Sequence, residues 1–267
     1  MTVTLLGVPY DTHSSFLRGP AEAPPAIRRA LTSGSANWCA ESGVDLDPLT
    51  HGGWRDGGDL ELPDEVEPAL ALIREAAAAA TADGSKLLSL GGDHLVTWPL
   101  ASVCSQQHDS LTVLHFDAHP DLYDSLDGDR YSHACPFARL MEEGRVGRLV
   151  QLGIRTATPH QREQADRFGV EMIELGRWDR VIPSLEGPVY VTIDLDALDP
   201  AFAPGVSHHE PGGMSTRELL DSLQQLTTMD VDVVGADIVE LNPTRDLNDT
   251  TAMVAAKLVR ELLDLMV

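Results

Sequence analysis

The chain has few cysteines and few basic residues. Cys39, Cys104 and Cys135 form no CxxC pair, which argues against a disulfide framework and against a structural zinc knuckle. No apolar run approaches the roughly 18 residues that a membrane span needs. The first residues carry no basic segment and run directly into Gly7, so we expect a first strand there and not a signal peptide. These absences predict a soluble, cytoplasmic protein with no membrane contact.

Basic residues number 19 against 42 acidic ones, which gives a formal net charge of −23. Such a charge argues against nucleic acid or an anionic membrane surface as a partner. It would attract a cationic substrate. Acidity also arises from solubility or a salty habitat, so charge alone leaves both explanations open.

The 267 residues show no linker or composition shift, so we expect one domain over 1–267. Short apolar runs, partly β-branched, are typical of buried strands and occur at 3–8, 86–90, 111–116, 148–152, 189–193 and 231–236. Helical stretches lie between them, at 21–32, 64–82, 161–168, 215–226 and 250–265. Ser215 and Glu218 form the pattern of a capping box. This alternation predicts a three-layer α/β/α fold with a mostly parallel sheet.

The segment Asp117-Ala118-His119-Pro120-Asp121 directly follows one of these apolar runs. Alternate residues of an extended strand point to the same side, so the two carboxylates and the imidazole could converge on one point. By itself the pattern is equally typical of a solvated loop that caps a helix.

Two further strand ends carry the same chemistry. His94 closes Gly91-Gly92-Asp93-His94, and Asp194 and Asp196 follow the run at 189–193. The carboxyl ends of parallel strands meet at one edge of the sheet, where ligands collect. Close carboxylates repel each other unless cations neutralise them, and four carboxylates balance two divalent ions. The sequence therefore predicts a binuclear metal site, which would lower the pKa of a bridging water.

These segments, with 192–200, Ala203-Pro204-Gly205 and Glu240-Leu241-Asn242-Pro243, resemble the ureohydrolase (arginase/agmatinase) family. The resemblance runs in order from about Gly7 to the C-terminal helix. It implies a sheet of about eight strands, two Mn²⁺ ions per subunit and a homotrimer or homohexamer.

The resemblance also implies roles for single residues. One ion would be held by His94, Asp117, Asp121 and Asp194, and the other by Asp117, His119, Asp194 and Asp196. His133 would be the proton shuttle and Glu240 the partner of the substrate guanidinium, with Asp121 as a further catalytic residue. A planar guanidinium suits a carboxylate because it offers parallel donors. Further contacts with the substrate are expected from Tyr123, Asp124, His208 and His209, the last two at the pocket rim.

The reaction implied is hydrolysis of a small guanidino compound to urea and an amine. The loop at 122–130 contains Asp124, Asp127 and Asp129, which would repel an α-carboxylate and favour a cationic tail. The amino-acid sequences of this loop, of the segment YSHACPF at 131–137 and of residues 151–155 resemble those of microbial agmatinases. We therefore expect agmatine as substrate, cleaved to putrescine and urea. The segment at 205–211 departs from the agmatinase pattern, so aminopropyl-agmatine, guanidinobutyrate, arginine and formiminoglutamate stay open.

Three alternatives remain. A one-zinc amidohydrolase of the histone-deacetylase kind shares this architecture, but two imidazole ligands favour two metals. A non-hydrolytic binding protein of the same fold would be expected to have lost ligands, and none is missing. Cys135 lies two residues from His133 and invites a cysteine nucleophile, which the metal ligands make unnecessary.

Overall fold

One sheet of eight parallel strands organises the computed structural model, which describes residues 2–50 and 52–267. The strands lie in the order β2-β1-β3-β8-β7-β4-β5-β6. Their bounds are β1 (Val3–Val8), β2 (Trp54–Asp59), β3 (Lys86–Gly91), β4 (Leu111–Phe116), β5 (Val146–Ile154), β6 (Glu171–Glu174), β7 (Glu186–Asp194) and β8 (Asp230–Val239). The predicted three-layer fold with a parallel sheet is confirmed.

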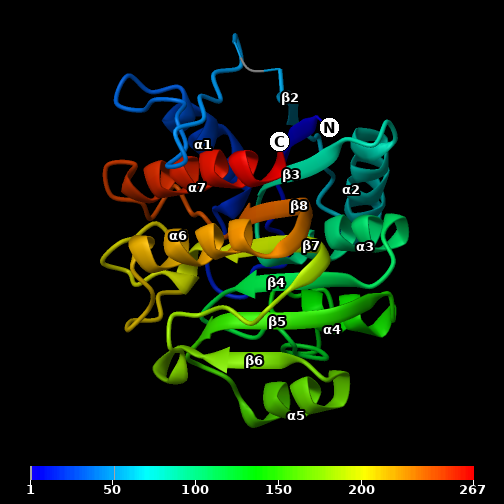
Figure 1. Cartoon of the computed structure of the whole chain (residues 1–267). Helices are drawn as coiled ribbons and strands as arrows, with labels where there is room; N and C mark the ends of the chain where they lie inside the picture. The colour runs from blue at the N-terminus through cyan, green and yellow to red at the C-terminus, as the bar shows by residue number, and fades with distance from the viewer. Residues whose placement is uncertain (1, 51) are drawn as a thin grey trace.

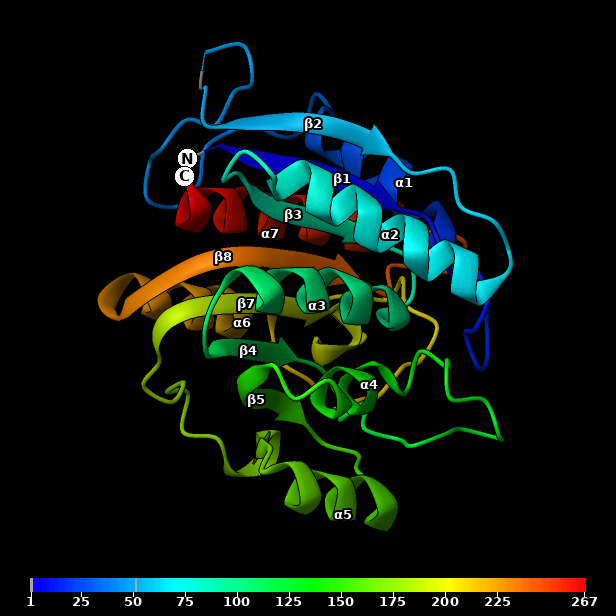
Figure 2. The same cartoon turned by 90° about the vertical axis from the view of Figure 1, so that its right-hand side faces the viewer.

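Helices cover both faces of this sheet (Figures 1 and 2). The helices α1 (Ala23–Leu31), α6 (Thr216–Gln225) and α7 (Thr250–Met266) pack on one face. The other face is covered by α2 (Val66–Thr81), α3 (Thr97–Gln107), α4 (Pro136–Glu142) and α5 (Pro159–Phe168). Short 3₁₀ turns are η1 (Pro20–Glu22), η2 (His94–Val96), η3 (Leu175–Arg177), η4 (Leu195–Ala197) and η5 (Leu226–Thr228). Two hydrophobic cores result, one on each side of the sheet.

All six predicted strands and all five predicted helices are present. The capping box at the start of α6 is also confirmed, since Glu218 N donates to Ser215 Oγ at 3.1 Å and Ser215 N donates to Glu218 Oε2 at 2.8 Å. The sequence analysis did not predict β2, β6, α3 or α4. Within the described part of the chain, no helix is both long and apolar enough to cross a membrane.

The parallel sheet brings four strand ends to one edge. The carboxyl ends of β3, β4, β7 and β8 lead into His94, Asp117, Asp194 and Glu240 respectively. Gly92, directly after β3, lets the backbone of Tyr10 approach closely, because a Cβ atom there would lie 1.8 Å from the carbonyl oxygen of Tyr10. This edge is where the sequence predicted ligands to collect.

Candidate metal centre and active site

His94 stands at the centre of three carboxylates from two different strand ends. Its Nδ1 atom lies 3.1 Å from Asp117 Oδ2, 3.1 Å from Asp121 Oδ2 and 3.2 Å from Asp194 Oδ2. The ring is fully buried, and Nδ1 has no well-aligned hydrogen-bond partner among the described residues. An orphaned nitrogen facing carboxylate oxygens is the donor arrangement that a divalent cation would complete. These are the four ligands predicted for the first ion.

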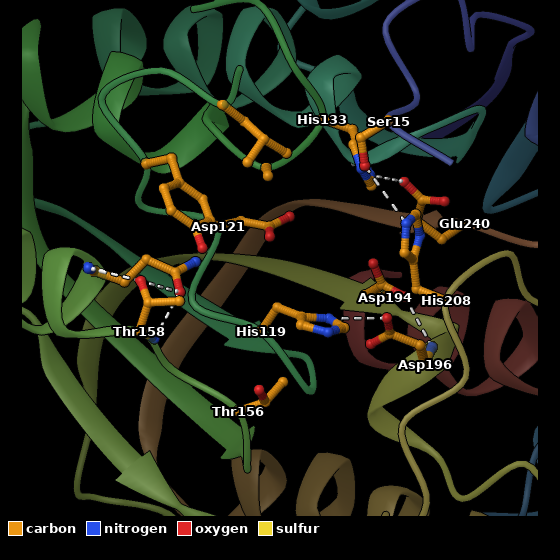
Figure 3. A pocket seen from close by; sticks show the side chains of 14 residues that line it. Ser15, His119, Asp121, His133, Thr156, Thr158, Asp194, Asp196, His208 and Glu240 are labelled. Atoms are coloured by element: carbon orange, nitrogen blue, oxygen red, sulfur yellow. Dashed lines mark hydrogen bonds and ion pairs between the residues drawn. The ribbon is translucent and has the colours of Figure 1, made fainter. Parts of the chain in front are cut away.

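A second cluster adjoins the first. His119 Nδ1 lies 3.0 Å from Asp196 Oδ2 (Figure 3). The same nitrogen lies 3.4 Å from Asp117 Oδ1. Asp117 thus turns one oxygen toward each imidazole, as a bridging carboxylate would. Asp194 turns Oδ2 toward His94, while its Oδ1 accepts from Asp196 N at 2.8 Å. A bridging role for Asp194 stays a prediction.

The reason given for the convergence of Asp117, His119 and Asp121 was wrong. β4 ends at Phe116, so the three residues lie in a loop and not on an extended strand. His119 N donates to Asp117 Oδ1 at 2.6 Å, which closes a tight Asx-type turn. Asp121 has φ 47°, a left-handed conformation that is uncommon for residues other than glycine. The turn, and not strand alternation, brings the side chains together.

The cluster strongly favours positive charge. Burial disfavours a charged ring, but the surrounding carboxylates outweigh this effect and raise the pKa of His94 well above its usual value. For His119 the attraction of Asp196 likewise overcomes burial and raises the pKa to about 12. Burial and the neighbouring carboxylates raise the pKa of Asp194 well above its ordinary value. Charges packed this closely need a counter-ion, and the residues present fit two divalent cations.

His133 and Glu240 form an ion pair beside this cluster. His133 Nδ1 lies 2.9 Å from Glu240 Oε1, which also accepts from the main-chain N of His94 at 3.0 Å. Burial alone would lower the pKa of His133, but the attraction of Glu240 raises it to about 9. Glu240 has φ 66°, a second left-handed residue at the site, and such strain is typical of functional positions. The structure therefore brings together the predicted shuttle and the predicted guanidinium partner.

One pocket joins these groups (Figure 3). The predicted residues that line it are His119, Asp121, Tyr123, His133, Asp194, Asp196, His208 and Glu240. The His208 ring stacks on that of His133, with centroids 4.9 Å apart. His209 does not line the pocket: its Nε2 lies 2.7 Å from the carbonyl oxygen of Pro204. The prediction of a rim position is thus supported for His208 but not for His209.

The acidic loop at 122–130 does not present its carboxylates to the pocket. Asp124 pairs with Arg139 at 3.2 Å, and Asp129 Oδ2 lies 2.5 Å from His13 Nδ1. Neither aspartate lines the pocket, nor does Asp127. Asp124, expected to contact the substrate, therefore points to Arg139 and does not line the pocket.

Sequence reasoning missed the neutral lining of the pocket. Thr156, Thr158 and Gln161 come from the loop after β5 and the first turn of α5. Thr158 caps α5, and its main-chain N and Oγ1 donate to Gln161 Oε1 at 3.0 and 3.2 Å. The pattern Thr-x-x-Gln is a capping box that was readable in the sequence. Ser15 was missed as well, and its Oγ lies 2.8 Å from His133 Nε2.

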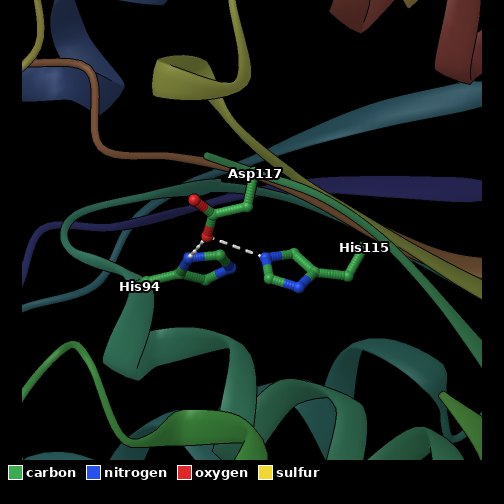
Figure 4. A group of neighbouring side chains, drawn as sticks. All are labelled: His94, His115 and Asp117. Atoms are coloured by element: carbon green, nitrogen blue, oxygen red, sulfur yellow. Dashed lines mark hydrogen bonds and ion pairs between the residues drawn. The ribbon is translucent and has the colours of Figure 1, made fainter. Parts of the chain in front are cut away.

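His115 is a further missed residue, buried in β4 (Figure 4). Gln151 Nε2 donates to His115 Nδ1 at 3.0 Å, so His115 Nε2 carries the proton and donates to Asp117 Oδ2 at 2.8 Å. Groups that orient a metal ligand in this way are common around metal sites. The sequence feature that could have identified His115 is its position two residues before Asp117, on the same side of an extended strand.

Cys135 does not offer a nucleophile in this structure. Its side chain is buried, and burial raises the pKa of the thiol to about 12. A thiol held protonated at neutral pH is a poor nucleophile. The expectation that catalysis does not use this cysteine is thereby supported.

Comparison with known proteins agrees with the geometry. The model of the arginase family matches residues 1–264. The chain is 47% identical to arginase 1, mitochondrial, of Arabidopsis thaliana, over 98% of this chain and 80% of that protein. It is 35% identical to an agmatinase of Bacillus anthracis, over 98% and 90% of the two chains.

Solved structures give the same result. The arginase of Medicago truncatula superposes with a TM-score of 0.88 at 43% identity, covering 98% of this chain and 86% of that one. The agmatine ureohydrolase of Thermoplasma volcanium superposes with a TM-score of 0.83 at 29% identity, covering 99% and 89%. The predicted family is confirmed, although the plant arginases are more similar than the agmatinases named here. The chain belongs to the arginase family of ureohydrolases.

Proposed function

We propose that this ureohydrolase cleaves L-arginine to ornithine and urea. The observation that carries the proposal is the composition of one pocket. Asp194, Asp196 and the His133–Glu240 pair lie at one side of the pocket, and Thr158, which is hydrogen-bonded to Gln161, lies at the other (Figure 3). The higher identity to arginases supports the same choice.

Two Mn²⁺ ions are the proposed cofactor. His94, Asp117, Asp121 and Asp194 would hold one ion, and Asp117, His119, Asp194 and Asp196 the other. Such a pair lowers the pKa of a bound water and so supplies hydroxide near neutral pH. Mixed carboxylate and imidazole ligands suit manganese, and metal availability decides among similar divalent ions.

Glu240 is proposed to receive the guanidinium. Its carboxylate is buried, and the attraction of His133 outweighs burial and keeps the pKa of Glu240 below its usual value. A buried, ionised carboxylate pairs strongly with a planar cation that offers parallel N–H donors. The contacts of Glu240 Oε1 with His133 Nδ1 at 2.9 Å and with the main-chain N of His94 at 3.0 Å hold that carboxylate in place beside the pocket.

His133 is proposed to supply the proton that the leaving amine needs. The attraction of Glu240 raises the pKa of His133 to about 9, which favours a protonated ring. Nδ1 is held by Glu240, and Nε2 faces the hydroxyl of Ser15 in the pocket lining. A positioned proton donor of this kind suits general acid catalysis.

The far side of the pocket favours a carboxylate tail. Gln161 Oε1 already accepts from Thr158, and no described residue accepts from Gln161 Nε2. The amide is therefore left as a donor at the N-terminus of α5, where the helix dipole also favours negative charge. The α-carboxylate of arginine meets both preferences, and agmatine lacks that group.

Agmatine, with putrescine as its product, is the second candidate. The net charge of −23 would attract this dication, and the agmatinase of Bacillus anthracis is 35% identical. A role in polyamine synthesis would follow from this substrate. The assembly proposed for either substrate is a homotrimer or homohexamer, which light scattering would test.

A panel of urea-release assays decides between the candidates. The manganese-loaded chain is offered arginine, agmatine, guanidinobutyrate and aminopropyl-agmatine at equal concentrations. We expect the highest kcat/KM with arginine, loss of urea release after chelation and recovery with Mn²⁺. A higher kcat/KM with agmatine would replace the proposed substrate. If no compound released urea although two ions were bound per chain, the proposed ureohydrolase activity would be wrong.

A further inference from the structure

His160 is an exposed histidine in the first turn of α5, and the proposed reaction does not use it. Its ring stacks on the ring of Tyr123, with centroids 5.8 Å apart and an angle of 19° between the planes. Its Nε2 atom accepts a hydrogen bond from the main-chain N of Asp124 at 3.3 Å. Among the described residues, no other hydrogen bond or ion pair joins the loop at 122–130 to α5. One side chain therefore ties this loop to the helix.

The position of the His160 ring is fixed from two sides. On the helix side, Thr158 caps α5 through its capping box with Gln161, and Pro159 occupies the first helical position. On the loop side, only a ring nitrogen without a proton can accept from the N–H of Asp124, so the proton of the neutral ring lies on Nδ1. This hydrogen bond limits the rotation of the ring and keeps its face against the tyrosine.

Tyr123 is the pocket residue that this contact restrains. It is half-buried and lines the pocket together with Gln161. Its main-chain N donates to the carbonyl oxygen of Ala134 at 3.1 Å, but its hydroxyl has no hydrogen-bond partner in the described part of the chain. A phenol O–H is a donor that suits a carboxylate. The hydroxyl is therefore free to bind a substrate when the ring is held in the pocket wall.

We propose that His160 is a positioning residue that holds Tyr123 in the pocket wall, where the Tyr123 hydroxyl binds the carboxylate tail of the substrate. The inference rests on arginine as the substrate of the proposed function. The competing explanation is that His160 only packs on the surface of α5. The two explanations differ in the kinetic constant that changes. Neither side chain bonds to a proposed metal ligand or to His133, so a positioning role alters KM for arginine and leaves kcat nearly unchanged.

The test compares His160→Ala, His160→Phe and Tyr123→Phe in the manganese-loaded full chain, with Glu163→Gln as the control on α5. His160→Ala should raise KM for arginine about fivefold, and His160→Phe, which restores a ring for stacking, should recover most of that loss. Tyr123→Phe, which keeps the ring, should raise KM for arginine about tenfold and leave KM for agmatine nearly unchanged. Thermal unfolding checks each fold, and His160→Ser replaces the alanine variant if that chain does not fold.

The double variant His160→Ala with Tyr123→Phe decides whether one residue acts through the other. If His160 acts through the hydroxyl, its removal adds little to KM for arginine once the hydroxyl is gone. Fully additive effects, an unchanged KM in His160→Ala, or an equal change in Glu163→Gln would each overturn the inference.

The same measurements separate this inference from the proposed substrate. A wild-type chain that prefers agmatine overturns only the substrate if His160→Ala and Tyr123→Phe still raise KM for arginine. If that chain prefers agmatine and neither variant changes KM for arginine, both proposals are wrong.

Discussion

The two sides of the pocket are built from opposite chemistry. On one side, buried aspartates and histidines crowd together around positions that require cations. On the other, Thr156, Thr158 and Gln161 present hydroxyl and amide groups without charge. We propose that the first side carries out the reaction, because a metal pair and a proton donor would serve any guanidino compound. We propose that the second side selects the compound, because the substrate tail would lie there.

The largest effect is expected from removing a carboxylate of the charged side. Asp194→Asn should lower kcat by roughly 1,000-fold, equal to about 4 kcal/mol, because it weakens the predicted bridge between the ions. Urea release and ions per chain measure the effect. Activity near that of the wild type, with both ions retained, would contradict the assigned ligand.

The proton donor should matter less than the metal ligands. His133→Asn is expected to lower kcat by about 100-fold, since it removes a general acid while the carboxylate clusters stay intact. Elemental analysis should still find the wild-type number of ions. Loss of metal in this variant would show that His133 binds metal, and the role in proton transfer would then be wrong.

The charge of the His133–Glu240 pair predicts a pH effect of defined sign. Removing the carboxylate in Glu240→Gln should lower the pKa of His133 from about 9 toward its usual 6.5. Because the folded-state pKa is raised, the pair stabilises the fold fully below pH 6.5, and this contribution is lost as the pH rises through 9. NMR titration of the ring measures the shift. A stability deficit of Glu240→Gln that persists well above pH 9 would contradict the pairing.

Adding a charge to the neutral side of the pocket tests whether that side selects the substrate. Gln161→Glu should raise KM for arginine and lower KM for agmatine, changing their ratio by about tenfold, or about 1.4 kcal/mol. Glu163→Gln is the matched control, since Glu163 is exposed on the same helix and does not line the pocket. If Gln161→Glu still released urea and the ratio of the two KM values were unchanged, α5 would not contribute to substrate selection.

The smallest effects separate two neighbouring histidines at the rim. His208→Ala should raise KM by a few-fold, because this ring lines the pocket and stacks on His133. His209→Ala should leave KM unchanged, since its ring bonds to the loop carbonyl of Pro204. Steady-state kinetics with arginine tests both. Equal effects of the two variants would contradict the assignment.

Prediction from sequence worked best where elements are buried. Each of the six strands found by pattern has an apolar stretch, whereas β2 is exposed at every position after Trp54 and lies at the sheet edge. β6, at the opposite edge, is short and only partly buried. α3 is buried over most of its length and so shows no amphipathic period. These elements lack the contrast between apolar and polar positions on which sequence patterns depend.

The sequence alone was enough to predict the family, because its motifs contain the six residues expected to bind metal together with His133 and Glu240. The expected metal ligands and Glu240 lie at or just after strand ends, whereas His133 lies in the loop before α4, so local motifs suffice to find them. Only the tertiary structure decided what faces the substrate tail. It turned Asp124 and His209 away, and it brought Ser15 and Gln161, 146 residues apart in the chain, to one pocket. Side-chain direction in loops depends on contacts between distant segments, and no local pattern records those contacts.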